Sequence, residues 1–206
     1  MERNLNIRKN SENCLSLLKH IQHSIDEHSS VIGSLVNHLS EIEQIADLVI
    51  HTLKTSKKIL LMGNGGSAGD AQHIAAELVG RFSRERRGLA AIALTTDTSI
   101  LTSVGNDYGY EHIFSRQVEA LANTDDLVIG ISTSGNSNNV LQALKAAKSL
   151  GCKTVALLGK DGGEIKNIVG LPLIIPSTNT ARIQEVHILV GHIICEIVDL
   201  AFTTDI

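Results

Sequence analysis

A histidine and a glutamate four positions apart follow a glycine-rich segment in the first half of the chain. The segment reads GNGGSAGD at residues 63–70, and His73 and Glu77 come after it. On a helix this separation puts two side chains on one face, about one turn apart. A nitrogen and an oxygen donor beside exposed backbone could bind a metal ion or act as acid and base. For an arbitrary helix, a solvent-exposed pair would be the favoured interpretation.

Polar side chains of similar types interrupt an apolar helical pattern near the end of the chain. They are Gln184, His187 and His192, within TARIQEVHILVGHIICE. Gln184 and His192 would lie about 12 Å apart along a straight helix, so both contact one ion only by reaching toward each other. On sequence alone His187 is as good a candidate as His192, and a packed or interface histidine is its simplest interpretation.

A second small-residue loop, STSGNS at residues 132–137, also follows an apolar run. Glycines allow close approach, hydroxyls offer hydrogen bonds, and a new helix presents free N–H groups, which together suit an anion such as phosphate. The alternative is that Ser67 and Ser137 only cap their helices. Two such loops at one end of a sheet favour a ligand. Neither is a Walker loop, and Ala68 replaces the third glycine of a dinucleotide motif.

The elements that must position these loops alternate along the chain. Helical patterns separate short runs of Val, Ile and Leu, which predicts right-handed crossovers and a doubly wound, mainly parallel five-stranded α/β sheet. Ligands of such sheets bind outside the carboxyl ends of the strands. The predicted strands are 57–62, 89–94, 126–132, 153–159 and 171–176, and the predicted helices are 67–82, 111–122, 137–150 and 180–202.

The first 55 residues lack strands and are helical in period. Apolar residues from Ile32 to Leu53 step by three or four, and an earlier helix through Cys14 and Ile25 is predicted to end near residues 27–30. We therefore expect one domain over 1–206, with an N-terminal helical hairpin (1–55) and an α/β core (56–206). Such a hairpin has little core of its own, so it must pack on the core or on another subunit.

Composition excludes several classes of protein. The chain has 206 residues, a formal net charge of −4, 2% aromatic residues and three cysteines far apart in sequence. A nucleic-acid footprint, base-stacking surfaces, a disulfide framework and a sulfur-rich metal site are all disfavoured. The polar N-terminus has no signal-peptide pattern, and no apolar run approaches the ~18 residues of a membrane span. We expect a soluble, cytoplasmic protein with no membrane or nucleic-acid partner.

Five segments together resemble the phosphoheptose isomerases, which have the sugar-isomerase (SIS) fold. The segments are GNGGSAGDAQHIAAEL, SVGNDYGYEHIFSRQVEAL, GISTSGNSNNV, LLGKDGG and ARIQEVHILVGHIICE. They occur in the family's order over nearly the whole chain, most specifically over residues 60–196. The resemblance implies an enzyme that converts sedoheptulose 7-phosphate, a phosphorylated seven-carbon sugar, to D-glycero-D-manno-heptose 7-phosphate through an enediol. It also implies a homotetramer with centrally packed helices and heptose synthesis for surface glycans.

The resemblance carries over roles residue by residue. It implies one zinc ion per subunit and selects His192 over His187. The catalytic pair matches Glu77 and His192. The metal ligands match His73, Glu77, Gln184 and His192. The substrate-binding residues match Asn64, Gly65, Gly66, Ser67, Glu77, Asn106, Asp107, Ser132, Thr133, Ser134, Ser137 and Gln184. One position departs from the pattern: some members carry aspartate where this chain has Ala181, which changes a sugar contact but not the chemistry.

Two other functions compete with the enzyme. One close relative of the family is a tetrameric scaffold that binds the replication initiator DnaA, and ALTTDTSILT and CEIVDLAF look somewhat like it. A scaffold needs no acid–base pair, whereas Glu77 and His192 are both present here. A SIS-domain sensor of phosphosugars is the other alternative, and the lack of a DNA-binding domain disfavours it. We therefore predict the isomerase.

Overall fold

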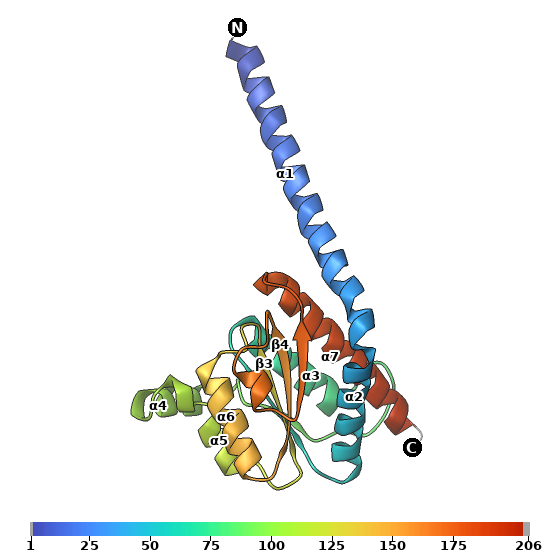
Figure 1. Cartoon of the computed structure of the whole chain (residues 1–206), viewed down its shortest axis with the longest axis vertical. Helices are drawn as coiled ribbons and strands as arrows, with labels where there is room; N and C mark the ends of the chain where they lie inside the picture. Colours follow the sequence, from blue (N-terminus) through green and yellow to red (C-terminus); the bar gives the residue numbers. More distant parts are fainter. Residues whose placement is uncertain (1, 204–206) are drawn as a thin grey trace.

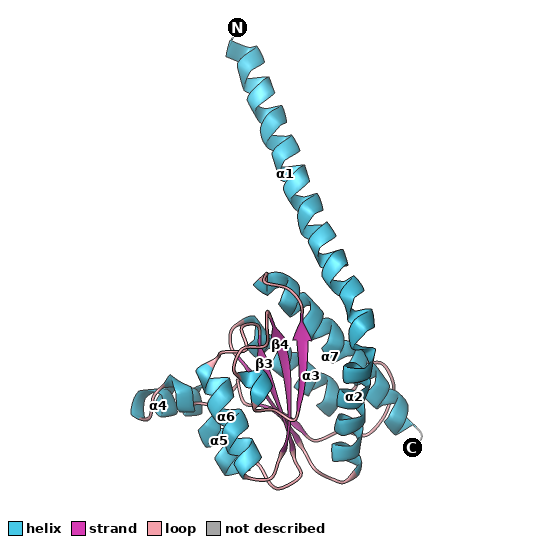
Figure 2. Cartoon of the chain, viewed as in Figure 1, coloured by secondary structure: helices cyan, strands magenta, loops and turns pink. Residues whose placement is uncertain are grey.

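The core of the protein is a five-stranded, all-parallel sheet (Figure 2). The computed structural model describes residues 2–203, with side chains described from residue 16. The predicted α/β fold is confirmed, and each predicted strand is present within about two residues of its predicted bounds. The strands are β1 (Ile59–Gly63), β2 (Ala91–Ala93), β3 (Leu127–Ser132), β4 (Lys153–Gly159) and β5 (Leu171–Ile175).

The strand order β2-β1-β3-β4-β5 places a topological switch between β1 and β3. The chain leaves β1 toward one edge of the sheet and returns at β3 to build toward the other. Crevices form where the crossovers diverge, at the carboxyl ends of these strands. Gly63, at the end of β1, pairs with Ile131, next to the end of β3. The two loops singled out above therefore start side by side.

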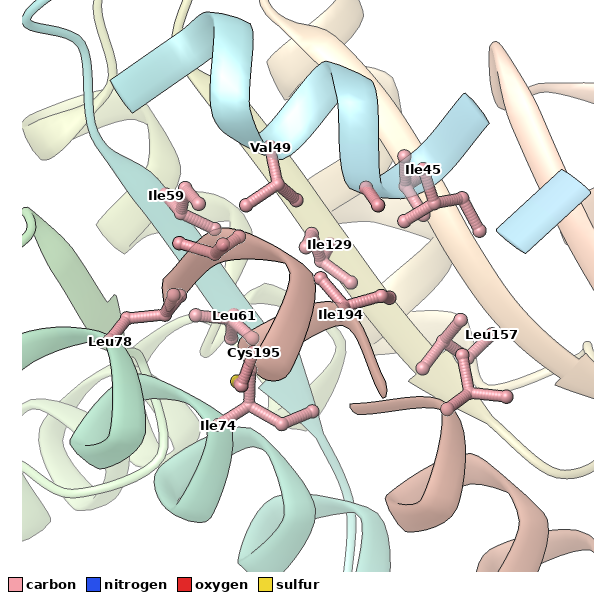
Figure 3. Close-up of a cluster of buried hydrophobic side chains, with 14 of the residues drawn as sticks. Ile45, Val49, Ile59, Leu61, Ile74, Leu78, Ile129, Leu157, Ile194 and Cys195 are labelled. Carbon is pink, nitrogen blue, oxygen red and sulfur yellow. The ribbon is translucent and has the colours of Figure 1, made fainter. Parts of the chain in front are cut away.

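Helices cover both faces of the sheet, which explains its continuous apolar strands. One face packs against α2 (Leu39–Lys54), α3 (Gly66–Val79) and α7 (Thr180–Phe202), around the core drawn in Figure 3. The other packs against α5 (Ser115–Leu121) and α6 (Asn138–Ser149). All residues of β1 and β3 are buried, as expected of central strands covered on two sides.

Helix α4 (Thr98–Asp107) was not predicted from the sequence, whose pattern favoured one helix over 111–122. The structure instead has a 3₁₀ turn, Tyr110–His112, followed by α5. No residue of α4 is buried, so the helix lacks the apolar stripe that periodicity detects. Its start is fixed locally, because the side chain of Asp97 accepts a hydrogen bond from the N–H of Ile100 at 2.9 Å.

The predicted N-terminal hairpin is wrong. Helix α1 (Glu2–Gly33) continues through a 3₁₀ segment (Ser34–His38) into α2, and both Gly33 and Leu39 keep right-handed helical dihedrals. Without a reversing turn the chain does not fold back, and α1 projects away from the domain (Figure 1). The side chain of Cys14, expected on the apolar face of this helix, lies outside the described residues.

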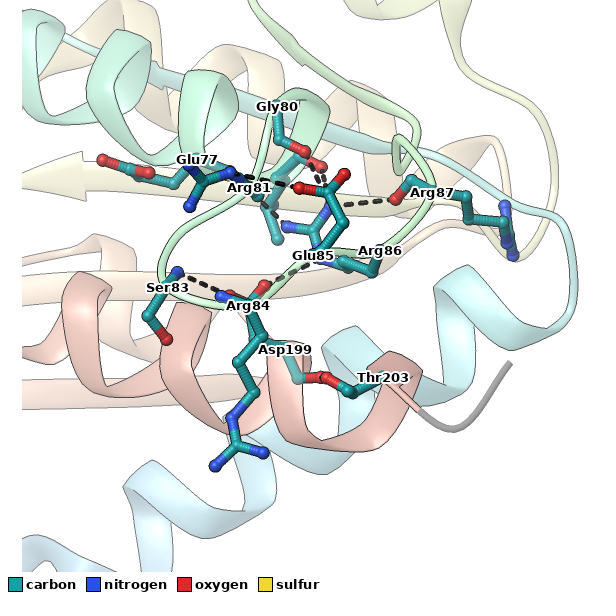
Figure 4. Close-up of polar contacts among 11 residues, drawn as sticks. Glu77, Gly80, Arg81, Ser83, Arg84, Glu85, Arg86, Arg87, Asp199 and Thr203 are labelled. Atoms are coloured by element: carbon teal, nitrogen blue, oxygen red, sulfur yellow. Dashed lines mark hydrogen bonds and ion pairs between the residues drawn. The ribbon is translucent and has the colours of Figure 1, made fainter. Parts of the chain in front are cut away.

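A buried ion pair joins the segment after α3 to the last helix (Figure 4). The Nε of Arg86 donates to Asp199 at 2.7 Å, and both side chains are fully buried. The backbone N–H groups of Ser83 and Arg84 donate to the other carboxylate oxygen of Asp199 at 2.7 and 2.8 Å. Arg86 also donates to the carbonyl oxygens of Glu77, Leu78, Gly80 and Arg87.

Among the described residues, no helix is long and apolar enough to cross a membrane.

The Asp199→Asn variant should lose about 3–5 kcal/mol of unfolding free energy near neutral pH, because it leaves Arg86 buried without its counter-charge. Denaturant titration measures the loss. The matched control is Glu85→Ala, which breaks the exposed pair between Arg81 and Glu85 and should cost under about 1 kcal/mol. Equal losses in the two variants would contradict the importance of the buried pair.

The same pair predicts a pH dependence. Burial raises the pKa of Asp199, but the N–H groups of Arg84 and Ser83 and the Arg86 guanidinium outweigh burial and hold this pKa below its ordinary 3.8. A carboxyl group whose pKa is lower in the folded state stabilises the fold at pH values above its unfolded pKa. This stabilisation is lost as the pH falls through the folded pKa. The stability gap between wild type and Asp199→Asn should therefore narrow below about pH 4.

Candidate active site

The first ligand loop connects β1 to α3 and contacts the last helix. Helix α3 begins at Gly66, where a Cβ atom would lie 2.5 Å from the Nε2 of Gln184. Only glycine lets the amide of Gln184 approach the backbone this closely. Ser67 lies inside α3, is buried, and does not occupy the N-cap position, which belongs to Gly65. The capping interpretation of Ser67 is therefore wrong.

The second loop forms a cluster of hydroxyl groups at the start of α6. The Oγ of Ser132 lies 2.9 Å from that of Ser137 and 3.5 Å from that of Ser134. Gly135 has a φ of +66° and its Cα packs on the backbone of Gly162, which fixes the turn. Ser137 occupies the N-cap position of α6 but makes no capping hydrogen bond with its side chain. Its hydroxyl therefore turns toward the cluster, beside the positive end of α6.

An asparagine pair joins the two loops. Asn64 follows β1 and Asn139 lies in the first turn of α6, and their side-chain amides exchange hydrogen bonds of 2.8 Å in both directions. The hydroxyl of Tyr110 donates to the same oxygen of Asn64 at 3.1 Å. Neither Asn139 nor Tyr110 was predicted as a site residue, although they lie in GISTSGNSNNV and SVGNDYGYEHIFSRQVEAL.

Helices α3 and α7 bring the predicted acid–base and metal groups together. The Nε2 of His73 lies 3.2 Å from a carboxylate oxygen of Glu77 and 3.0 Å from the Nε2 of His192. The two imidazole rings meet edge to face, with centroids 5.1 Å apart, and the Phe82 ring stacks on His192. Within the described side chains, no group of three or more His, Cys, Asp or Glu is arranged as a ready metal site. The contacts instead run in pairs through His73.

The structure separates His187 from this cluster. His187 is fully buried, and its Nε2 donates to the backbone carbonyl of Leu158 at 3.0 Å. Burial lowers the pKa of His187 to about 4, although that hydrogen bond acts in the opposite direction. The residue is thus a neutral, packed histidine of the interior. This is the plain interpretation that the sequence analysis left open for it.

Two predicted parts of the site make no hydrogen bond to the cluster around His73 among the described residues. The amide of Gln184 packs against Gly66, and no hydrogen bond links it to His73, Glu77 or His192 in the described part of the chain. Asn106 and Asp107 are exposed at the end of α4, where Asn106 donates to Asp107 at 2.8 Å. No hydrogen bond joins either residue to the other predicted positions among residues 16–203. Thr133 is partly buried in the second loop.

One acidic group near the cluster, Asp70, was not predicted as a site residue. Asp70 stands one turn before His73 on α3, and burial raises its pKa to about 6 while the charge of His73 opposes the shift. One of its carboxylate oxygens is buried without a hydrogen-bond partner among the described atoms. Its three-residue spacing from His73 was the available signal, since that spacing shares a helix face.

Comparison with known proteins decides the family. A model of the SIS domain matches residues 25–159. A phosphoheptose isomerase from Nitratiruptor sp. is 54% identical over 187 residues, which span 90% of this chain and 100% of that protein. One from Citrifermentans bemidjiense is 58% identical over 184 residues, 89% of this chain and 96% of that one. The chain belongs to the phosphoheptose isomerase family.

Solved structures agree with this placement. The phosphoheptose isomerase GmhA from Neisseria gonorrhoeae superimposes with a TM-score of 0.85 at 44% identity, covering 89% of this chain and 99% of that one. The enzyme from Francisella tularensis gives 0.86 at 39% identity, covering 89% and 98%. The protein is therefore an isomerase of sugar phosphates in heptose biosynthesis. Nothing in these phosphoheptose isomerases supports the DnaA-binding scaffold.

The Ser137→Ala variant should weaken phosphate-dependent binding of substrate while changing the unfolding free energy by no more than about 0.5 kcal/mol, because its hydroxyl caps nothing. Thr133→Val should behave similarly. The matched control is Asp97→Ala, which removes a real N-cap and should cost about 0.5–2 kcal/mol. Denaturant titration and substrate affinity are measured on all three variants. A stability loss in Ser137→Ala as large as that in the control, with unchanged affinity, would restore the capping interpretation.

Proposed function

We propose that this phosphoheptose isomerase converts sedoheptulose 7-phosphate to D-glycero-D-manno-heptose 7-phosphate. The observation that supports the proposal most is the contact of His73 with both Glu77 and His192. A loop lined with hydroxyl groups follows β3 at the topological switch. The protein thus offers candidate proton-transfer groups and a candidate phosphate site. An aldose–ketose isomerase acting on a phosphorylated sugar needs both.

Glu77 and His192 have the residue types that the reaction requires. A base removes a proton from C1 of the ketose, the electrons form an enediol, and a proton returns to C2. In the proposed assignment Glu77 is the base at carbon, and His192 moves protons between the two oxygens so that O1 becomes the aldehyde. Phosphate held by Ser132, Ser134 and Ser137, with Thr133 beside them, contributes binding energy away from the reacting carbons and fixes their orientation.

The residue types around His73 suit a divalent metal ion, although the described side chains do not form a ready site for one. The Nε2 of His192 lies 3.0 Å from the Nε2 of His73, and a carboxylate oxygen of Glu77 lies 3.2 Å from that same His73 atom. Ligand atoms bound to one tetrahedral zinc ion at about 2.0–2.1 Å lie roughly 3.3 Å apart. His73, Glu77 and His192 would hold the ion, and Gln184 would have to leave Gly66 to join them. When bound, a metal would polarise the sugar carbonyl.

The direct test is incubation of purified protein with sedoheptulose 7-phosphate, followed by NMR of the sugar protons. We expect the signals of the aldose to grow and, in D₂O, deuterium to enter at C2, because the proton that is returned comes from a group that exchanges with solvent. Conversion of a shorter ketose phosphate but not of the seven-carbon sugar would reject the proposed substrate and keep the reaction class.

The Glu77→Gln variant keeps the size of the side chain and removes its basicity, so turnover should fall at least ~100-fold, the scale of one general-base contribution. The melting temperature should change little, because Glu77 is linked to the fold through its backbone carbonyl, which the variant retains. Glu85→Ala, on the exposed loop after α3, is the control with unchanged turnover. Near-normal turnover of the Glu77→Gln variant would reject Glu77 as the catalytic base.

Metal dependence is tested by removing and returning the ion. A chelator should inhibit turnover, added zinc should restore it, and zinc should raise the melting temperature of the metal-free protein. His73→Ala should abolish that thermal shift. His51→Ala, an exposed histidine on α2, should retain it. Activity that survives thorough chelation would reject the metal and leave the proton-transfer roles of Glu77 and His192 standing.

The homotetramer implied by the family resemblance remains part of this proposal. Leu17, Leu18, Ile21 and Ile25 of α1 are each more than half exposed, which is unusual for an apolar helix stripe and supports burial against other subunits.

A further inference from the structure

Asn139 is a buried polar residue to which neither the sequence nor the family relationship gave a role. Only 3% of it is exposed, and its side chain makes three hydrogen bonds. Two of them are exchanged with Asn64, in the other ligand loop. Buried amides are costly unless their hydrogen bonds are made, so this pair constrains both loops strongly.

One backbone group fixes the orientation of the whole amide pair. The N–H of Val140 lies 2.9 Å from Oδ1 of Asn139, and a backbone N–H can only donate. The atom facing it must therefore be the oxygen of Asn139, which leaves the NH₂ group of Asn139 facing Asn64. Because that group donates, Asn64 must present its oxygen to it. The Tyr110 hydroxyl that contacts this oxygen is consequently a donor as well.

The orientation restricts what Asn64 can offer a ligand. Its Oδ1 already accepts two hydrogen bonds, from Asn139 and Tyr110, which uses both lone pairs. Its Nδ2 donates one hydrogen to Asn139, and no acceptor contacts the second hydrogen among the described side chains. Asn64 can therefore act toward a ligand as a hydrogen-bond donor and not as an acceptor.

We propose that Asn139 is a positioning residue: it holds Asn64 so that the free N–H of Asn64 points at an oxygen of the bound sugar. The Tyr110 hydroxyl supports this orientation by donating to the oxygen of Asn64. The inference rests on the proposed function, since it takes Asn64 as a substrate contact. It also gives a physical link between the two ends of the substrate. Asn139 belongs to the helix whose first turn lies beside the phosphate loop, so it sets the position of the sugar contact relative to that loop.

A double-mutant cycle with Asn64→Ala and Asn139→Ala tests this inference. Affinity for sedoheptulose 7-phosphate is measured from the ligand-dependent rise in melting temperature, and KM and kcat from NMR. If Asn139 acts through Asn64, each single variant should weaken affinity and raise KM about 10-fold, the scale of one lost hydrogen bond, and the double variant should be no worse than Asn64→Ala. Independent effects that multiply to about 100-fold would overturn the inference.

Three further variants guard against a merely structural effect. Asn139→Asp keeps the acceptor for Val140 and replaces the donor to Asn64 by an oxygen, so it should raise KM as Asn139→Ala does, even if the alanine variant folds poorly. Tyr110→Phe removes one hydroxyl and should raise KM a few-fold with an unchanged melting temperature. Asn138→Ala is the matched control, because the neighbouring Asn138 is exposed and its side chain bonds, among the described residues, only Gln142 of its own helix. Wild-type KM in Asn139→Asp would overturn the inference.

The measurements separate this inference from the proposed function. Wild-type protein that binds the sugar phosphate without converting it rejects the function, and the affinity cycle still decides the role of Asn139. If the wild-type protein converts the sugar phosphate and the effects of Asn64→Ala and Asn139→Ala multiply, the inference about Asn139 is rejected and the proposed function stands. Absence of both binding and conversion rejects both.

Discussion

The buried ion pair between Arg86 and Asp199 fixes the position of α3 relative to α7, and the candidate site depends on that position. Arg86 donates to the carbonyl oxygens of Glu77 and Leu78, in the last turn of α3, and of Gly80, just after it. Carbonyl groups at a helix end lack partners within the helix. Its Nε donates to Asp199, two turns beyond His192 on α7. A single guanidinium thus ends one helix and binds it to the other. Because His73 and Glu77 lie on α3, their distances to His192 follow from where this pair holds the two helices.

The sheet imposes a second constraint, which acts on the ligand loops. With the order β2-β1-β3-β4-β5, only β1 and β3 flank the switch point, so only their loops open into the same crevice. The hydroxyl cluster follows β3, and Asn64 follows β1. Strand pairing fixes the distance between β1 and β3 but not the distance between the loops that follow them. The Asn64–Asn139 pair fixes the distance between these two loops. The His73 cluster and the hydroxyl loop are therefore positioned by different contacts, the first by the Arg86–Asp199 pair and the second by the Asn64–Asn139 pair.

The sequence predicted those parts of the structure that local pattern controls. Buried parallel strands read as continuous apolar runs, and β4 and α7 have the bounds predicted for them. What it missed depends on tertiary contact. Arg86 belongs to RFSRERRG, which reads as an exposed basic segment, and only the fold brings Asp199 to it from 113 residues away. Asn139 likewise reads as one of two adjacent asparagines in an exposed helix start. The wrong prediction of an N-terminal hairpin has a different cause. The hairpin was expected to bury apolar residues by packing within this chain or on another subunit, whereas α1 leaves several of them exposed.

The choice between His187 and His192 shows most clearly where the sequence stops being sufficient. His192 lies five positions after His187, which places it about 140° around the helix, so the two side chains cannot serve the same face. Periodicity alone does not say which face of α7 meets the sheet and which meets α3. In the structure His187 faces β4, where burial keeps it neutral by lowering its pKa, although its hydrogen bond to the Leu158 carbonyl acts in the opposite direction. His192 faces α3, where it stays accessible and contacts His73. The same residue type therefore has a packing role at one position and a partly exposed nitrogen that contacts His73 at the other. The difference comes from the face of α7 that each residue occupies.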